Sequence, residues 1–148
     1  MRKLLAIAAV LAVAACSDNG PLTNDDFDPS LGVDLDQMTL TASGLYYQDL
    51  TVGTGDPAAA GDTVVVTFAG YLTNGNRFDT GTFAFELDAN PLQVIRGFDE
   101  GVTGMRVDGI RKLVVPPDLA YGSSGAGGGL IPPNATLVFD IALTSINP

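Results

Sequence analysis

Short stretches of alternating apolar and polar residues, separated by Gly, Pro and Asn-Gly, run from residue 44 to the C-terminus. Because successive side chains of a strand point to opposite faces, this alternation is typical of an antiparallel sheet with one buried face. In the last stretch, for example, Leu137, Phe139, Ile141 and Leu143 would share a face. We expect strands over 44–52, 62–72, 77–79, 83–87, 111–115 and 136–146.

Turn residues separate these predicted strands. Asn74-Gly75 supplies residues that tolerate the positive φ of a tight hairpin, and Pro116-Pro117 would end the strand at 111–115. Thr80-Gly81-Thr82 is expected to form a small turn between 77–79 and 83–87.

Only one segment of this region has a helical period. Ile95, Phe98, Val102 and Met105 are spaced three, four and three residues apart, which places them on one stripe. Interior glycines weaken such a helix by ~1 kcal/mol each, so we expect it to be short and held by packing. One short helix beside several strands, each with one apolar face, predicts an α+β domain over residues 44–148 with the sheet wrapped around the helix.

The first sixteen residues have the pattern of an export signal. Arg2-Lys3 precedes twelve apolar residues, which is too short for a membrane span of ~20 residues but suits a signal peptide. The ending, residues 11–16, resembles the bacterial lipobox, and this resemblance implies that Cys16 is lipidated and becomes the new N-terminus. Ser17 then points to the outer membrane, facing the periplasm of a bacterial envelope. A plain secretory signal with an incidental cysteine, or a short buried helix, are the alternatives.

Residues 17–43 are acidic and poor in apolar residues. Between 17 and 40 the chain carries six Asp and no Lys or Arg. Such a composition buries too little apolar surface to offset its ordering entropy, which predicts a flexible tether. The alternative is an edge strand formed by Leu31, Val33, Leu35 and Leu40.

Composition removes several classes of chemistry. The 148 residues include 17 carboxylates, 7 Lys plus Arg, no His and one Cys, for a net charge of -10. Without His, neither a Ser-His-Asp nor a Cys-His nucleophile can form, and imidazole metal sites are unavailable. A single Cys excludes an internal disulfide. We therefore expect no metal and no cofactor, and the acidic balance argues against nucleic-acid binding.

Aromatic residues are the first indication of a binding site. Six of the seven Phe lie in the predicted domain, with Tyr121 ahead of a glycine-rich stretch that ends in Pro132-Pro133. Either these rings form the core, which is the interpretation we prefer for Phe85, or some of them line a concavity at one end of the helix. The stretch 121–133 would then act as a mobile flap.

Four motifs stand in a fixed order in this region: Arg77-Phe78-Asp79 after Asn74-Gly75, the run 94–102 (VIRGFDEGV), Ala120-Tyr121-Gly122, and the run 131–140 (IPPNATLVFD). In sequence and spacing they resemble the FKBP-type peptidyl-prolyl cis-trans isomerases, over residues 44–146. The resemblance implies an antiparallel half-barrel of five to six strands around a short helix, and rotamase activity on Xaa-Pro bonds. Such activity needs no covalent chemistry.

The resemblance also implies a proline pocket, with Phe98 as its floor. The Ile95 N–H and the Tyr121 hydroxyl would hold substrate carbonyls, and Asp79 would bias the electrostatics; alternatively, Asp79 caps the turn at Thr80-Gly81. The remaining implied substrate-binding residues are Phe68, Phe78, Phe83, Val94, Ile131 and Phe139. The chain departs from the family at Phe68, where Tyr is common, at Phe98, where Trp is frequent, and in the short stretch between Asp79 and Phe83.

Proline-containing unfolded or nascent polypeptides are the substrates that this resemblance implies, with macrolides as further ligands. We expect a monomer, attached to the membrane only by its lipid. Two other classes remain open: a proline-peptide-binding or chaperone module with little turnover, and a structural envelope lipoprotein with a vestigial pocket. Accelerated relaxation of Xaa-Pro peptides distinguishes the enzyme from both.

Overall fold

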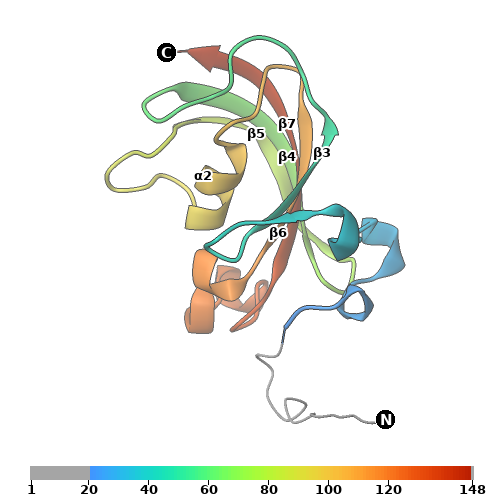
Figure 1. The fold of residues 1–148 in the computed structure, drawn as a ribbon. Coiled ribbons are helices and arrows are strands. Elements are labelled where there is room, and N and C mark those ends of the chain that lie inside the picture. The colour runs from blue at the N-terminus through green and yellow to red at the C-terminus, as the bar shows by residue number, and fades with distance from the viewer. Residues whose placement is uncertain (1–20, 148) are drawn as a thin grey trace.

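A six-stranded antiparallel sheet curves around one short helix, α2, in the computed structural model, which describes residues 21–147 (Figure 1). The strands follow the spatial order β2-β3-β6-β7-β4-β5. Their bounds are β2 Thr39–Leu40, β3 Tyr46–Thr51, β4 Thr63–Leu72, β5 Arg77–Glu86, β6 Ile110–Val115 and β7 Leu137–Asn147, with α2 at Arg96–Val102. The predicted α+β class and the predicted sheet around a helix are confirmed. The expected signal peptide 1–16 and Cys16 lie outside the described residues.

In the described part of the chain, six short 3-10 helices occupy the connections and the N-terminal segment. Their bounds are η1 Asn24–Asp26, η2 Pro29–Leu31, η3 Leu35–Gln37, η4 Pro117–Leu119, η5 Gly122–Ser124 and η6 Gly127–Gly129. Within residues 21–147, none of the helices has the length and hydropathy needed to span a bilayer.

The main core fills the concave side of the sheet, under α2. Leu137, Phe139, Ile141 and Leu143 of β7 are all buried there, as their alternation predicts. Phe98, Val102 and Met105 from the predicted helical stripe pack against them. The side chains of the strand alternation and of the helical stripe thus pack in one core.

Two glycines let α2 approach β6 closely. A Cβ on Gly97 would overlap Val115, and one on Gly101 would overlap Leu113. The glycines that weaken the helix as an isolated element are therefore the ones that its packing requires. This close approach fixes the depth at which Phe98 lies.

The turn predicted at Thr80-Gly81-Thr82 is wrong, because β5 runs without interruption through these residues. Gly81 lies opposite Phe68 of β4 in the strand register. Thr82 Oγ1 lies 2.8 Å from Thr67 Oγ1, and Thr80 Oγ1 donates to Phe68 O at 2.9 Å. β-branched residues with such cross-strand bonds favour a strand over a turn.

The tether predicted over 17–43 is also wrong from residue 21 onward, since this part packs on the convex face of the sheet. Phe27 and Leu31 are buried against Val114 and Val138, which point away from the main core. Lys112 Nζ donates to Leu31 O at 2.7 Å. Apolar residues on the outer face of the sheet require a cover, and the sparse apolar residues of the segment provide it.

The alternative prediction for this segment, an edge strand, holds for two residues only. Thr39 and Leu40 pair with Tyr47 and Tyr46 of β3. The preceding residues form 3-10 turns instead, as at η2, where the Asp28 carboxylate accepts a hydrogen bond from Ser30 N at 2.9 Å. We call residues 21–40 the N-terminal strap.

Candidate functional site

A cavity of about 340 Å³ opens between the N-terminal end of α2, the strands β4 and β5, and the loop that follows β6. Its wall is largely aromatic. The lining residues are Phe68, Phe78, Asp79, Thr80, Gly81, Thr82, Phe83, Gln93, Val94, Ile95, Phe98, Tyr121 and Phe139.

Phe98 is the centre of the aromatic cluster and is 3% exposed. Its ring centroid lies 5.2 Å from that of Phe139 and 5.7 Å from that of Phe68, both nearly perpendicular. Phe78 continues the cluster by packing edge-on against Phe139 at 5.8 Å. Edge-to-face packing of this kind orients the rings and adds ~0.5–1.5 kcal/mol per pair beyond area burial, so the wall is preformed.

All the predicted pocket residues except Ile131 line this one cavity. Ile131 is buried in the main core, where it forms a bridge with Ala126 through two backbone hydrogen bonds of 3.0 Å. These bonds close the loop on itself, which leaves the Ile131 side chain inside the fold. Phe85 stacks on Phe83 but lies behind the cavity wall, in agreement with its interpretation as a core residue.

Sequence reasoning missed Thr80, Gly81, Thr82 and Gln93, which also line the cavity. The sequence predicts a turn for the first three, and Gln93 precedes the motif 94–102 by one residue. The Gln93 side chain accepts a hydrogen bond from Glu86 N at 2.9 Å, which ties it to β5. The signal that could have found the three β5 residues is the flanking Thr pair, which favours a strand.

The predicted flap forms two short 3-10 turns, η5 and η6. Of the stretch 121–133, only Tyr121 lines the cavity, and its side chain is 40% exposed. Leu130 is 55% exposed and does not line the cavity.

The polar side chains that line the cavity belong to Asp79, Thr80, Thr82, Gln93 and Tyr121. Among residues 21–147, no group accepts a hydrogen bond from the Ile95 N–H or from the Tyr121 hydroxyl. The Asp79 carboxylate accepts one from Thr80 N at 2.8 Å, so it caps a backbone amide within the strand as well as lining the cavity. Two open donors and one carboxylate beside an apolar hollow can orient a peptide, and they supply no nucleophile.

The loop that carries Val94 and Ile95 is clamped by Asp99, the residue after Phe98. Both carboxylate oxygens of Asp99 accept from Asp88 N, at 3.2 and 3.0 Å. Burial raises the pKa of Asp99, and the nearby Asp88 charge adds to the effect, while the hydrogen bond from Asp88 N opposes it.

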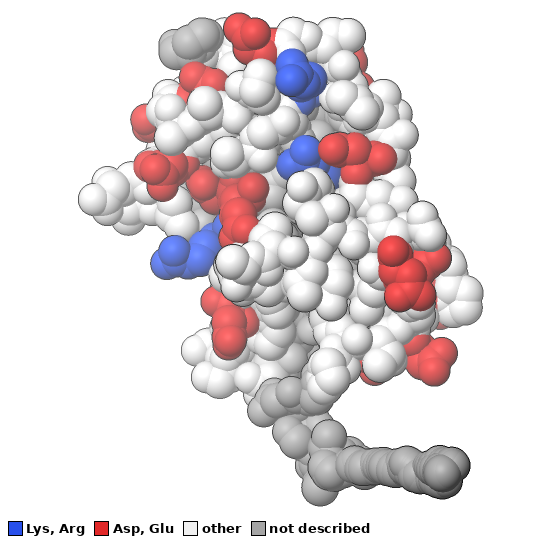
Figure 2. Space-filling view, in the orientation of Figure 1, with Lys and Arg blue, Asp and Glu red and all other residues white. Residues whose placement is uncertain are grey.

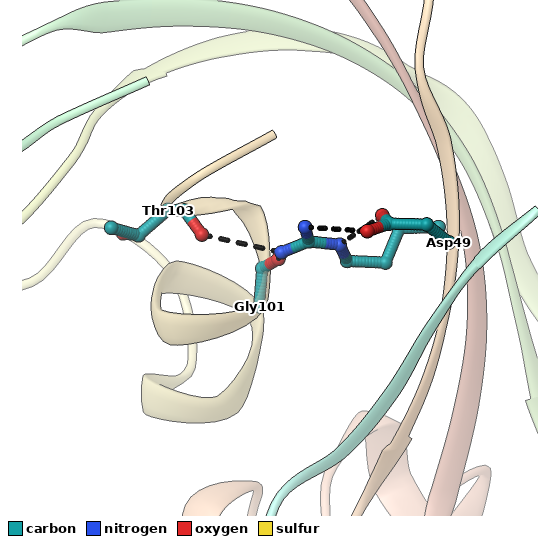
Figure 3. Close-up of polar contacts among 4 residues, drawn as sticks. Asp49, Gly101 and Thr103 are labelled. Atoms are coloured by element: carbon teal, nitrogen blue, oxygen red, sulfur yellow. Dashed lines mark hydrogen bonds and ion pairs between the residues drawn. The ribbon is translucent and has the colours of Figure 1, made fainter. Parts of the chain in front are cut away.

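Arg111 fixes the other end of α2 (Figure 3). Its guanidinium donates to both oxygens of Asp49, at 2.7 and 3.2 Å, and to the carbonyls of Gly101 and Thr103, at 3.0 and 3.3 Å. The Tyr47 ring lies 4.7 Å away, in a cation-π contact. Cations are favourable near the C-terminal carbonyls of a helix. The Arg111 guanidinium therefore holds α2, and with it Phe98, against β3 and β6.

Acidic side chains outnumber basic ones on the face shown in Figure 2, in line with the net charge of -10. The described residues include no cluster of three or more His, Cys, Asp or Glu that could hold a metal ion.

A family model described as FKBP-type peptidyl-prolyl cis-trans isomerase matches residues 55–144 of this chain. Among curated proteins, the chain is 50% identical over 106 residues to FK506-binding protein 4 of Dictyostelium discoideum, covering 70% of this chain and 28% of that one. It is 42% identical over 111 residues to the FK506-binding protein of Neisseria meningitidis serogroup B, covering 70% of this chain and 96% of that one.

Solved structures agree with these matches. FkpA from Escherichia coli superposes with a TM-score of 0.68 and 40% identity, covering 76% of this chain and 52% of that one. AtFKBP13 superposes with a TM-score of 0.66 and 36% identity, covering 73% and 97%. The match spans only 24% to 30% of the length of the three eukaryotic FK506-binding proteins named 4, so these relatives are much longer than the shared domain.

Proposed function

The chain belongs to the FKBP-type peptidyl-prolyl cis-trans isomerase family, and from this premise we propose that it accelerates rotation about Xaa-Pro bonds in polypeptides. The observation that carries the proposal is the ring-lined cavity around Phe98, beside two open hydrogen-bond donors. Its volume of about 340 Å³ leaves room for a pyrrolidine ring and part of the neighbouring chain.

Rotation about an Xaa-Pro bond requires loss of amide resonance, with a barrier of ~18–20 kcal/mol, while cis and trans differ by only about 1 kcal/mol. No bond to a nucleophile or a metal is needed. Catalysis requires only that the twisted amide be bound more tightly than the planar one. A site without a nucleophile therefore suits this reaction.

The rings of Phe68, Phe98 and Phe139 supply the apolar environment. The twisted amide has less charge separation than the planar form, so transfer from water into such a cavity disfavours the planar ground state more. The Ile95 N–H and the Tyr121 hydroxyl hold the carbonyls that flank the proline, which keeps one side of the bond fixed while the other rotates. The Asp79 carboxylate sets the sign of the local potential.

The test is the cis-to-trans relaxation of a short Xaa-Pro peptide with the full chain. We expect clear acceleration by the wild type and a loss of roughly 10- to 100-fold in kcat/KM for Phe139→Ala, because this change opens the wall beside Phe98. Circular dichroism of the variant checks that it is folded. A wild-type protein that leaves the relaxation rate at its uncatalysed value contradicts the proposal.

A proline-peptide-binding or chaperone module is the second candidate function, because the open donors and the cavity would also serve binding alone. It predicts peptide affinity with an unchanged relaxation rate. Titration of the same peptide, carrying a fluorescent label, with the protein separates the two functions. Fluorescence anisotropy of the label measures binding. A failure to bind any proline peptide, or a macrolide, would instead favour a structural lipoprotein with a vestigial pocket.

We also propose that the protein is exported, lipidated at Cys16 and held at the bacterial outer membrane facing the periplasm, as a monomer. The support is the sequence pattern of residues 1–17, and prolyl isomerisation is a slow folding step that needs no ATP outside the cytoplasm. Labelling of cells with a radioactive fatty acid should mark the wild type and not Cys16→Ser. Sedimentation of the wild type in detergent tests the monomer.

If Cys16 is the anchor, the strap determines the distance between the domain and the membrane. The described chain packs on the sheet from about residue 22 onward, so only about five residues separate it from Cys16. Five residues span at most roughly 18 Å when fully extended. The cavity would then work close to the membrane surface rather than at the end of a long tether.

A further inference from the structure

β5 is the last strand of the sheet, so within residues 21–147 one of its edges has no neighbouring strand. The uninterrupted course of this strand brings that edge to the cavity, because Thr80, Gly81, Thr82 and Phe83 all contribute to the lining. A terminal strand presents backbone donors and acceptors that can pair with another extended chain.

Hydrogen bonds at the end of β5 show which residues face the open edge. Leu87 N donates to Asp62 O at 2.9 Å, toward the β4 side, whereas Glu86 N donates to the Gln93 side chain, away from β4. In an antiparallel pair, alternate residues turn their N–H and C=O groups to the same neighbour. Even-numbered residues of β5 from 80 to 86 therefore face the open edge.

The two ends of this edge are already occupied. Thr80 N donates to the Asp79 carboxylate, and Gln93 covers Glu86 N, as described above. Between them, Thr82 and Ala84 are exposed, and no side chain of residues 21–147 bonds to their backbone amides. The open part of the edge is thus two residues long and borders the cavity at Thr82.

We propose that the backbone of Thr82 and Ala84 is a docking edge for the substrate chain next to its proline, which adds to β5 as a short extended strand while the ring occupies the cavity. The occupant is an unfolded polypeptide segment. Continuity with the cavity, through Thr82 and Phe83, supports this choice over a folded partner. The inference rests on the proposed isomerase function and names how that site holds its substrate.

Pairing through the backbone has a consequence for substrate choice. Main-chain hydrogen bonds give affinity without reading side chains, so they suit clients of diverse sequence. The covered amides at Thr80 and Glu86 limit the pairing to about three residues of the client. Substrates long enough to reach the edge should therefore be turned over better than tetrapeptides of the same core sequence.

The test compares a tetrapeptide with a decapeptide that has the same Xaa-Pro core at its centre, using the full chain. Two to four additional ordinary hydrogen bonds correspond to about 10-fold in affinity or more. We expect kcat/KM of the decapeptide to exceed that of the tetrapeptide about 10-fold. This ratio should fall to about 1 in Ala84→Pro, which removes one edge N–H at a position where an edge strand tolerates proline.

Matched controls separate backbone pairing from other effects of length. Ala84→Thr adds side-chain bulk but keeps the N–H, so it should retain the ratio. A decapeptide N-methylated at alternate flanking residues should lose it with the wild type. A ratio near 1 in the wild type, or a ratio that survives Ala84→Pro, overturns the docking edge although the isomerase function stands.

Hydrogen exchange gives a second readout that does not depend on turnover or on the folding of a variant. Saturating decapeptide should slow exchange of the Thr82 and Ala84 amides in the wild type, and tetrapeptide should not. Unprotected amides in the decapeptide complex overturn the proposal. Protected amides in a protein that fails to accelerate relaxation would contradict the isomerase function instead.

Discussion

Gly70 of β4 has no side chain, and two pocket rings occupy the space where one would stand. A Cβ at this position would lie 2.7 Å from Phe78 Cζ and 2.9 Å from Phe139 Cε1, which is too close for either ring to keep its place. The rings form two walls of the cavity. Gly70 is therefore a positioning residue whose role the sequence alone does not reveal.

We expect Gly70→Ala to lower kcat/KM for an Xaa-Pro peptide by about 10-fold or more and the free energy of unfolding by ~1–3 kcal/mol. Gly81→Ala is the control for stability, because its Cβ would meet only Phe68 Cε1 at an ordinary 3.8 Å. Urea unfolding and peptide relaxation provide the two measurements. Equal stability and activity in Gly70→Ala and the wild type would show that the rings do not depend on this gap.

Asp99 should make the stability of the protein depend on pH, because burial raises the pKa of this residue in the folded state. As pH falls from neutral, the folded protein binds this proton before the unfolded chain does, so the Asp99 contribution to stability increases toward acid and is complete below the unfolded pKa. Asp99→Asn keeps an acceptor for Asp88 N and removes the titration. The stability of Asp99→Asn relative to wild type should therefore be highest at pH 7 and decrease toward pH 4.

Asp28 supplies a control of opposite sign. Hydrogen bonds from Ser30 lower the pKa of this exposed carboxyl, so its contribution is present above the unfolded pKa and is lost as pH falls through the folded pKa. The stability of Asp28→Asn relative to wild type should increase toward acid. Parallel pH trends for the two variants, measured by urea unfolding, would contradict the assignment.

At the scale of elements, α2 illustrates what the pattern could and could not predict. The spacing of Ile95, Phe98, Val102 and Met105 predicts the helix, but sequence alone does not show that its interior glycines are needed for contact with β6. We expect Gly101→Ala to destabilise the protein by ~1–3 kcal/mol, although Ala favours isolated helices by ~1 kcal/mol. Arg96→Ala, at an exposed site on the same helix, should have little effect on the urea midpoint.

The packing of the strap on the sheet is the feature of the fold that is hardest to predict from the sequence. Its Asp residues indicate disorder, and the few apolar residues that dock it are too widely spaced to form a periodic pattern. The sequence feature that indicates docking of the strap lies in the sheet. Val114 and Val138 are apolar at outward positions of strands whose inward positions are also apolar. The prediction of a turn within β5 is wrong for a related reason, since a lone glycine between threonines fits both a turn and a strand.

The strap makes a stability prediction with a matched control. Leu31 is 6% exposed and Leu40 is 56% exposed, and both belong to the same segment. We expect Leu31→Ala to reduce the free energy of unfolding by ~2–3 kcal/mol and Leu40→Ala to change it by less than ~0.5 kcal/mol. Equal, small effects from the two substitutions would contradict the packing of the strap and support a flexible tether instead.

At the scale of the whole molecule, the curved sheet separates two apolar clusters with different tasks. The convex cluster attaches the strap, and the concave cluster continues without interruption from the core under α2 to the rings of the cavity. This continuity explains why the motifs could identify most of the lining from sequence. They could not place Ile131 or the β5 residues, because those positions depend on how a loop closes and how a strand runs.

Relaxation of an Xaa-Pro peptide with Phe98→Leu beside Phe85→Leu tests most directly whether the reaction takes place in this cavity. The two rings are equally buried, at 3% exposure, and lie 5.7 Å apart, but only Phe98 lines the cavity. We expect similar losses of stability and a fall in kcat/KM of about 10-fold or more for Phe98→Leu alone. Equal catalytic losses in the two folded variants, or none in either, would contradict a reaction that takes place in this cavity.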